Sequence, residues 1–189
     1  MKLLYLDLET TGLNPKQCSI VQLGIMLEID GEVKNSLCIY VKPFEGCVIE
    51  PGVEAVHDCI PKAQSCGETY TDVYKNLCKL MEKYVDKYNK KDKFFLVGYN
   101  IGFDDAFMRE MWRRNRDVYY GSWFWWPALD VAVLAGQYLM AERHRLENCK
   151  LSTLAAYLNI ERVGGAHDAL SDIHLTREIY QRVKGGQNV

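Results

Sequence analysis

The chain has 189 residues, of which 48% are hydrophobic and 25% are charged. These proportions are typical of one globular domain and exclude a disordered or fibrous protein. The formal net charge of −2 excludes a surface that is basic throughout, but it permits local contact with nucleic acid. The first apolar run is far too short for a signal peptide or a membrane span, so we expect neither in this chain.

The cysteines are scattered, odd in number and form no CxxC pair, which argues against a zinc site and against a disulfide framework. We therefore expect reduced thiols and a cytoplasmic protein. The seven positions are Cys18, Cys38, Cys47, Cys59, Cys66, Cys78 and Cys149.

The first quarter of the chain predicts strands. Apolar runs and alternation indicate strands at residues 3–8, 19–29 and 33–41. The second and third are joined by Asp30-Gly31, a strong hairpin signal. A loop is expected over residues 43–51.

Helices and strands then alternate. The patterns predict a helix over 68–90, a strand at 94–97, a helix over 104–116, a short helix at 151–158 and a last helix at 168–183. Residues 129–134 fit either a fifth strand or the step into a helix near 132–141. This order indicates an α/β layer fold with a mixed sheet. Residues 1–184 are expected to form one domain, with 185–189 as a short flexible tail.

Two acids stand at the end of the first predicted strand. Asp7 and Glu9 are two residues apart, so their side chains point to the same face of the sheet. An apolar strand tolerates two buried charges poorly unless something compensates them. The simple alternative is that both acids lie past the strand end in solvent.

Two further segments place acids near predicted helix starts. Asp104 follows the strand at 94–97 and opens the next helix, where a capping role is also common. His167 and Asp172 are five positions apart, and both reach one site only if His167 precedes the last helix. A capping or surface histidine is the alternative for His167. Asp168 is predicted to cap that helix.

If these segments converge, four carboxylates share one pocket and cannot all ionise unaided. An all-oxygen ligand set suits Mg²⁺ or Mn²⁺ rather than zinc. Two such ions form a common site for displacement at phosphorus, and a histidine can take the proton of the attacking water.

Three segments resemble, in order and spacing, the motifs of the DEDDh 3′–5′ exonucleases, the DnaQ-like family. They are Asp7-Leu8-Glu9-Thr10-Thr11-Gly12-Leu13, Asn100-x2-Phe103-Asp104 and His167-x4-Asp172. The resemblance extends from residue 3 to about 183. It implies a ribonuclease-H-like fold with a mixed five-stranded sheet flanked by helices.

The resemblance also implies roles for individual residues. The ligands of two divalent ions, Mg²⁺ or Mn²⁺, would be Asp7, Glu9, Asp104 and Asp172, and the general base would be His167. Residues expected to contact or position the substrate are Thr10, Leu13, His57 and Asn100. The segment around His57 is one residue longer than the family's pattern, so a plain loop histidine is an equal alternative there. Asp130 is predicted to be a structural helix cap.

The implied reaction releases nucleoside 5′-monophosphates from a single-stranded 3′ end. DNA is favoured because Glu9-Thr10-Thr11-Gly12-Leu13 is closer to the proofreading type than to the oligoribonuclease type. An RNA exonuclease of the oligoribonuclease type is one alternative. A non-catalytic nucleic-acid- or polymerase-binding module is another, and a phosphatase-like enzyme is a third.

Two other features have open interpretations. Arg109, Arg113 and Arg116 could follow a nucleic-acid backbone, although a solvated helix face is favoured. Residues 119–126 contain six aromatic side chains in eight positions. They could pack in the core, stack bases, or bind a polymerase or a second copy of the chain.

Overall fold

The computed structural model describes residues 1–53, 58–162 and 168–185. Five strands form one sheet in the order β3-β2-β1-β4-β5. β1 pairs antiparallel with β2 and parallel with β4, so the sheet is mixed, as predicted. The strands are β1 (Lys2–Thr10), β2 (Ile20–Ile29), β3 (Glu32–Tyr40), β4 (Phe95–Gly98) and β5 (Leu129–Asp130).

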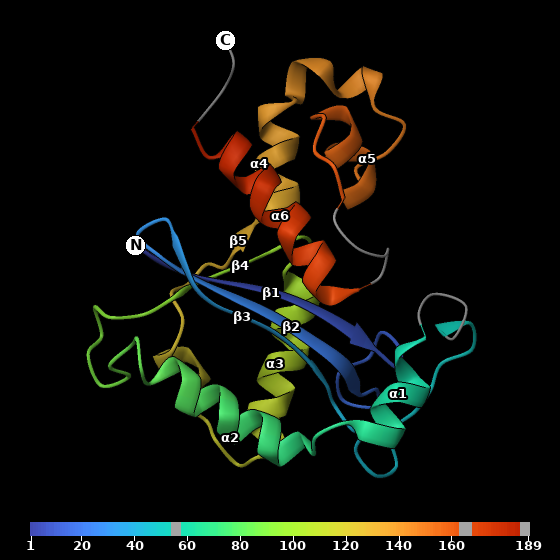
Figure 1. Ribbon diagram of the computed structural model, residues 1–189, viewed down its shortest axis with the longest axis vertical. Helices are drawn as coiled ribbons and strands as arrows, with labels where there is room; N and C mark the ends of the chain where they lie inside the picture. The colour runs from blue at the N-terminus through green and yellow to red at the C-terminus, as the bar shows by residue number, and fades with distance from the viewer. Residues whose placement is uncertain (54–57, 163–167, 186–189) are drawn as a thin grey trace.

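Helices cover both faces of this sheet (Figure 1). α2 and α3 form one apolar core with it, while α4, α5 and α6 form a second core on the opposite face. The α-helices are α1 (Cys59–Cys66), α2 (Tyr70–Met81), α3 (Gly102–Arg114), α4 (Val131–Tyr138), α5 (Leu151–Tyr157) and α6 (Ala169–Val183).

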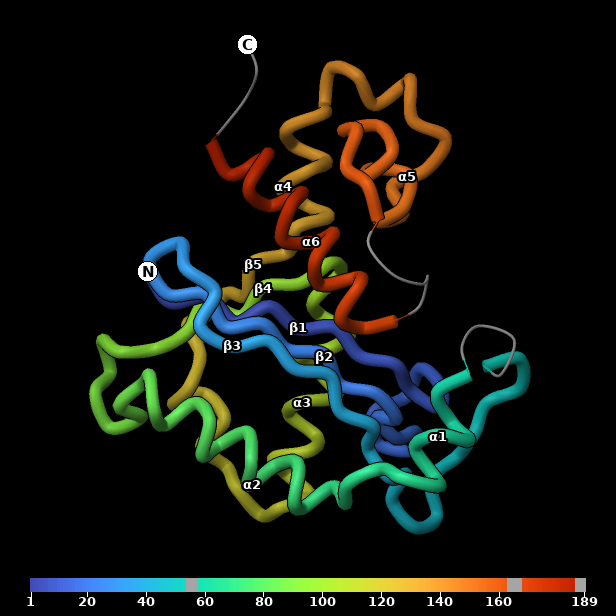
Figure 2. Tube along the Cα trace, viewed as in Figure 1, coloured from blue at the N-terminus to red at the C-terminus, as the bar shows by residue number. Residues whose placement is uncertain are grey.

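The hairpin prediction is confirmed. Asp30 and Gly31 have φ values of 51° and 88°, the left-handed conformation that a tight two-residue turn between twisted strands requires. The backbone N–H of Asp30 donates to the carbonyl of Met1 at 2.8 Å, so the start of the chain lies beside this turn (Figure 2). The contact extends the pairing of β1 and β2 to the end of the sheet.

The predicted helix over 68–90 is too long. α2 begins after Thr69, whose hydroxyl oxygen accepts from the backbone N–H of Asp72, and it ends at Met81. Irregular turns follow, although no glycine or proline marks this end. α1 was not predicted. Its Pro61 lies in the first helical turn, where proline is tolerated because its missing N–H would have no partner within the helix. At 129–134 a two-residue strand leads directly into α4, so both alternatives hold in part.

Gly24 allows α6 to lie directly on the sheet. A Cβ atom at this position would come within 2.9 Å of the Cβ of Ala169 and 2.8 Å of the side chain of Ile173. Gly24 is also the β-ladder partner of Asp7 on β1. The close approach therefore brings the first turn of α6 next to the acidic end of β1.

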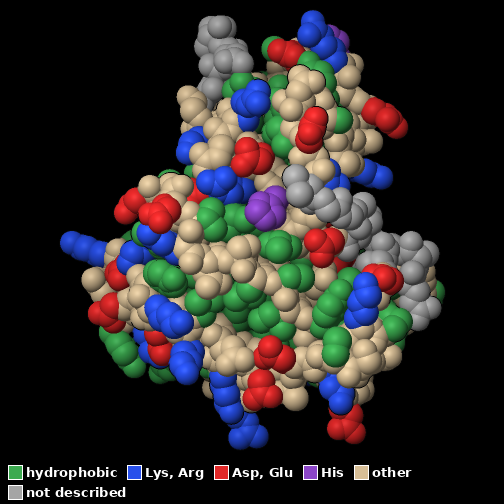
Figure 3. Space-filling model, in the orientation of Figure 1, with side chains coloured by type: hydrophobic (Ala, Val, Ile, Leu, Met, Phe, Trp, Pro, Cys, Tyr) green, Lys and Arg blue, Asp and Glu red, His purple; other side chains and the backbone are tan. Residues whose placement is uncertain are grey.

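The surface carries charges of both signs. Figure 3 shows Lys and Arg side chains interspersed with Asp and Glu over the visible face, as the small net charge predicts. Within the described residues, no helix has the length and apolar character needed to span a bilayer.

Candidate active site

The end of β1 brings acidic side chains to one point. Asp7 and Glu9 lie on the same face of the strand, and Asp172 approaches them from the first turn of α6. Each of the three offers a carboxylate oxygen, and these oxygens lie within 4.8 Å of one another. Glu9 is only 8% exposed. The structure thus places three of the four predicted ligands in one cluster, rather than in solvent past the strand end.

The start of α6 is held in place by contacts to β2. Asp168 caps the helix, as predicted, with its carboxylate accepting from the backbone N–H of Ser171 at 3.1 Å. The side chain of Gln22 accepts from the backbone N–H of Ala169 at 3.0 Å. Asp172 lies one turn further on. These contacts fix the position of the Asp172 carboxylate over β1.

The fourth predicted ligand, Asp104, is in the first turn of α3 and only 4% exposed. Its carboxylate is not among the three whose oxygens lie within 4.8 Å of one another. Asp104 nevertheless interacts electrostatically with the cluster: burial is the largest cause of the raised pKa of the Asp7 carboxyl, and the charge of Asp104 is the second. Asp104 therefore belongs to the same acidic site at a greater separation.

Crowding and burial raise the pKa values of these acids. The pKa of Glu9 rises to about 8, mainly because the side chain is buried and further because of Asp172 and Asp168. The pKa of Asp104 is also raised by burial, although backbone N–H groups partly oppose the shift. A divalent cation would relieve this repulsion, and an all-oxygen donor set suits a hard cation. Asp7, Glu9 and Asp172 could therefore hold a metal ion.

Arg162 adds a positive charge that was not predicted. Its guanidinium donates to the carboxylate of Asp172 and, at 3.2 Å, to the hydroxyl of Ser171. The same guanidinium acts against the rise in the pKa of Asp7. Arg162 is therefore the cation that partly balances the acidic cluster in the structure. Its neighbours in sequence form no motif that would have indicated this role.

A cavity of about 380 Å³ adjoins the acidic cluster. Its lining includes Glu9 and two of the predicted substrate residues, Thr10 and Leu13. Leu13 is 75% exposed, whereas the buried hydroxyl of Thr10 donates to the carbonyl of Gly12 at 2.7 Å. The cavity wall also contains Phe103, whose ring was not predicted to be part of the site although it stands beside Asp104 in the second motif.

Two other predicted residues, Asn100 and Asp130, do not line this cavity but contact each other. Asn100 is exposed at the end of β4, has a φ of 57°, and its backbone N–H donates to the carboxylate of Asp130 at 3.1 Å. The same carboxylate accepts from the backbone N–H of Ala132, so the predicted capping role of Asp130 is confirmed. His57 and His167 lie outside the described residues.

The fold and a family comparison place this chain among the exonucleases of the DnaQ-like DEDDh superfamily. A family model described as "Exonuclease" matches residues 4–180, which is most of the chain. The chain therefore belongs to this exonuclease family, and the predicted family and ribonuclease-H-like fold are confirmed. A comparison with curated proteins found no match.

Solved structures show the same fold. Exonuclease I of E. coli in complex with a dT13 oligonucleotide superposes with a TM-score of 0.78 at 24% identity, covering 97% of this chain and 41% of that one. The zinc-bound form of the E. coli exonuclease I–ssDNA complex gives a TM-score of 0.79 at 24% identity, covering 97% of this chain and 40% of that one. The chain thus spans about two fifths of the length of these proteins.

Proposed function

We propose that this protein is a metal-dependent 3′–5′ exonuclease that removes nucleoside 5′-monophosphates one at a time from a single-stranded 3′ end, with DNA favoured. The observation that carries the proposal is the convergence of Asp7, Glu9 and Asp172, within 4.8 Å, beside a cavity lined by Thr10 and Leu13. A metal-ligand set next to a nucleotide-sized cavity suits hydrolysis at a terminal phosphodiester.

The metal ligands in this proposal are Asp7, Glu9, Asp104 and Asp172, with two Mg²⁺ or Mn²⁺ ions as the cofactors. Bound metal would supply Lewis acidity at the scissile phosphate and lower the pKa of water. The raised pKa of Glu9 supports this assignment, because a buried group of mutually repelling carboxylates costs free energy that bound cations offset.

The protein's own side chains would hold the terminal nucleotide and accept the proton of the attacking water. Leu13 and Phe103 present apolar surface to the 380 Å³ cavity, where they can pack on the terminal base and sugar. His167 is proposed to accept the proton of the attacking water, since an imidazole titrates near neutral pH. Asn100 and His57 are proposed to position the strand near its 3′ end.

Single-stranded DNA is the favoured substrate for two reasons. The motif Glu9-Thr10-Thr11-Gly12-Leu13 resembles the proofreading type more closely than the oligoribonuclease type. The structurally similar E. coli exonuclease I was solved with bound oligonucleotides such as dT13. Cleavage of short RNA in preference to DNA would instead support the oligoribonuclease alternative, and binding without cleavage would support a non-catalytic module.

The test is a parallel digestion of 3′-labelled single-stranded DNA, duplex DNA and short RNA with Mg²⁺, Mn²⁺ or EDTA. We expect mononucleotide release from single-stranded DNA that stops with EDTA, and loss of activity in Asp7→Asn and His167→Ala. His174→Ala is the matched control, because His174 is an exposed histidine on α6. Full activity of either active-site variant would refute the mechanism.

We further propose that residues 1–184 act as one exonuclease domain in the cytoplasm. The seven cysteines are free thiols in the structure, which is consistent with a reducing compartment. Association with a polymerase or with a second copy through residues 119–126 stays a prediction. The flexible tail predicted at 185–189 falls almost entirely outside the described residues.

A further inference from the structure

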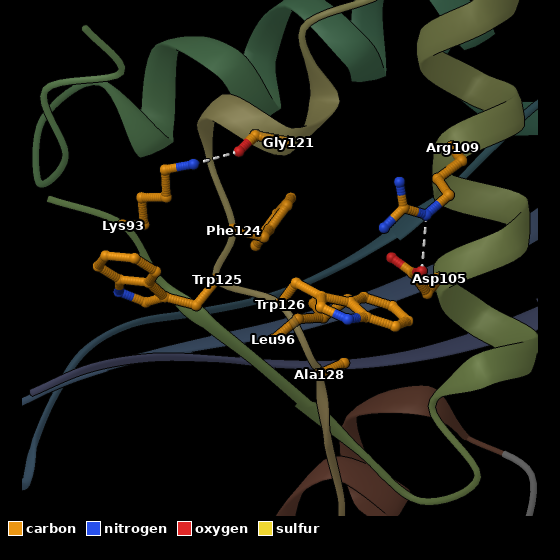
Figure 4. Close-up of a pocket in the computed structure, with 9 residues that line it drawn as sticks. All are labelled: Lys93, Leu96, Asp105, Arg109, Gly121, Phe124, Trp125, Trp126 and Ala128. Carbon is orange, nitrogen blue, oxygen red and sulfur yellow. Dashed lines mark hydrogen bonds and ion pairs between the residues drawn. The ribbon is translucent and has the colours of Figure 1, made fainter. Parts of the chain in front are cut away.

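A second cavity, of about 460 Å³, opens beside α3, which lines it with Asp105 and Arg109 (Figure 4). Aromatic and basic side chains line it together. Its lining comes from the segment that precedes β5, from residues in and just before β4, and from α3. The lining residues used below are Lys93, Asp105, Arg109, Phe124, Trp125 and Trp126.

The aromatic segment 119–126 divides between the core and this cavity. Tyr120, Trp123 and Phe124 are buried. Trp126, by contrast, is 80% exposed, and Figure 4 shows its indole extending across the cavity toward α3. A large, flat, exposed aromatic ring that is not needed for the core is the kind of surface on which a nucleobase stacks.

Two cations line the same cavity as this ring. Arg109 pairs with Asp105 through its Nε at 2.7 Å, and Figure 4 shows its guanidinium turned into the cavity. Lys93 donates to the carbonyl of Gly121 at 2.5 Å and lies 5.7 Å from the ring centre of Trp125. Among the described residues that line the cavity, Asp105 is the one acid, and it accepts from both Arg109 and the hydroxyl of Tyr120. The cavity therefore keeps a net positive charge.

Position connects this cavity with the proposed active site. Three successive residues of α3 face three different places: Phe103 lines the cavity beside Glu9, Asp104 faces the acidic cluster, and Asp105 lines the cavity with Trp126. Successive Cα atoms are only about 3.8 Å apart. Both cavities therefore adjoin the first turn of α3, and a strand whose 3′ end lies at the acidic cluster would pass this turn to enter the second cavity.

We propose that this cavity binds a nucleotide of the substrate strand on the 5′ side of the scissile bond, with the base stacked on Trp126 and a phosphate held by Lys93 and Arg109. The inference rests on the proposed exonuclease function. A protein partner fits less well, because lysine is depleted from the centres of protein interfaces, whereas paired aromatic and basic groups are typical of single-strand binding surfaces.

A comparison of two substrates distinguishes a failure of this inference from a failure of the proposed exonuclease function. Thymidine 5′-(p-nitrophenyl phosphate) has no upstream nucleotide, whereas an oligothymidylate does. For Trp126→Ala we expect KM for the oligothymidylate to rise by about 5- to 150-fold, the range that loss of one stacked base implies, while KM for the p-nitrophenyl ester stays unchanged. Trp126→Phe should restore most of the affinity, since it keeps an aromatic face.

The matched control is Tyr119→Ala, because Tyr119 is a 70% exposed aromatic residue of the same segment that lines a different cavity. It should leave both KM values unchanged. Lys93→Gln should reduce the slope of log affinity against log salt by about 0.7, the loss of one phosphate contact on a single strand.

Several outcomes would overturn the inference while leaving the exonuclease function in place. One is wild-type cleavage of the oligothymidylate with no change of KM in Trp126→Ala. Another is an equal loss on both substrates, or a loss in Tyr119→Ala as large as in Trp126→Ala. A wild-type dimer that Trp126→Ala converts to a monomer in sedimentation would assign the surface to self-association instead. Absence of cleavage by the wild type would refute the proposed function itself.

Discussion

Glu9→Gln should stabilise the metal-free protein at alkaline pH, although it removes a proposed metal ligand. Glu9 is 8% exposed, and its pKa is raised from the ordinary 4.5 to about 8. The folded state thus holds the Glu9 proton more tightly than the unfolded state does. Below pH 4.5 both states keep the proton. As the pH rises toward 8 the unfolded state loses it first, so stability falls across this interval.

The size of the effect follows from the same two values. Each pH unit between them contributes about 1.4 kcal/mol, which gives roughly 3–5 kcal/mol by pH 8.5. Glutamine is similar in size and neutral at every pH, so Glu9→Gln should lack this loss. We expect its free energy of unfolding in EDTA to exceed that of the wild type by this amount at pH 8.5. The difference should vanish near pH 4.5.

Urea unfolding in EDTA, followed by tryptophan fluorescence between pH 4.5 and 9, measures the difference. Glu28→Gln is the matched control, because Glu28 is also buried, on the adjacent strand β2, but pairs with Arg177 at 2.6 Å. That variant should be less stable than the wild type by a few kcal/mol at pH 8.5, since it leaves part of the Arg177 charge uncompensated. Excess Mg²⁺ should stabilise the wild type more than Glu9→Gln. An unchanged pH dependence in Glu9→Gln would refute the account of the acidic cluster.

Three further predictions concern the acidic cluster and the elements around it. Arg162→Ala should raise divalent-metal affinity several-fold in calorimetric titration, because it removes a competitor for the Asp172 carboxylate; weaker affinity would show that Arg162 instead orients that carboxylate. Gly24→Ala should lower the free energy of unfolding by about 1–3 kcal/mol in urea titrations and reduce kcat, since a Cβ there displaces α6; wild-type values of both would contradict the packing argument. Asp130→Ala should cost about 1 kcal/mol by removing a helix cap that also accepts from Asn100, with kcat near that of the wild type as the check that Asp130 is structural.

The elements that carry the site were predictable, because local patterns define them. Alternation and the Asp30-Gly31 turn indicated β2 and β3, the strands that extend the sheet from β1, which carries Asp7 and Glu9. Each acidic motif stands at the end of a strand or at the start of a helix, where its spacing can be read directly. The end of α2 was not predictable, since Glu82, which follows its last residue, is a good helix former. Local propensity contains no information about such an end.

The contacts that complete the site were not predictable for a related reason. Arg162 reaches Asp172 across ten residues, and nothing in its own neighbourhood distinguishes it from a surface arginine. The same limit applies to the segment 119–126, whose composition does not separate the buried Trp123 from the exposed Trp126. That division depends on the packing of Trp123 against distant parts of the chain.

The net charge of −2 also constrains how this fold can attract a polyanion. Charges of both signs are interspersed on the face in Figure 3, so attraction by that face as a whole is small at physiological salt, where screening acts over about 8 Å. Under the two proposals above, attraction would come from local sources, namely metal held at Asp7 and the cations Lys93 and Arg109. Few phosphates are contacted in such an arrangement. Each contact contributes about 0.7 to the slope of log affinity against log salt concentration. Oligonucleotide affinity should therefore depend on salt with a slope of about 1–2, and a slope several times steeper would require a basic surface beyond these residues.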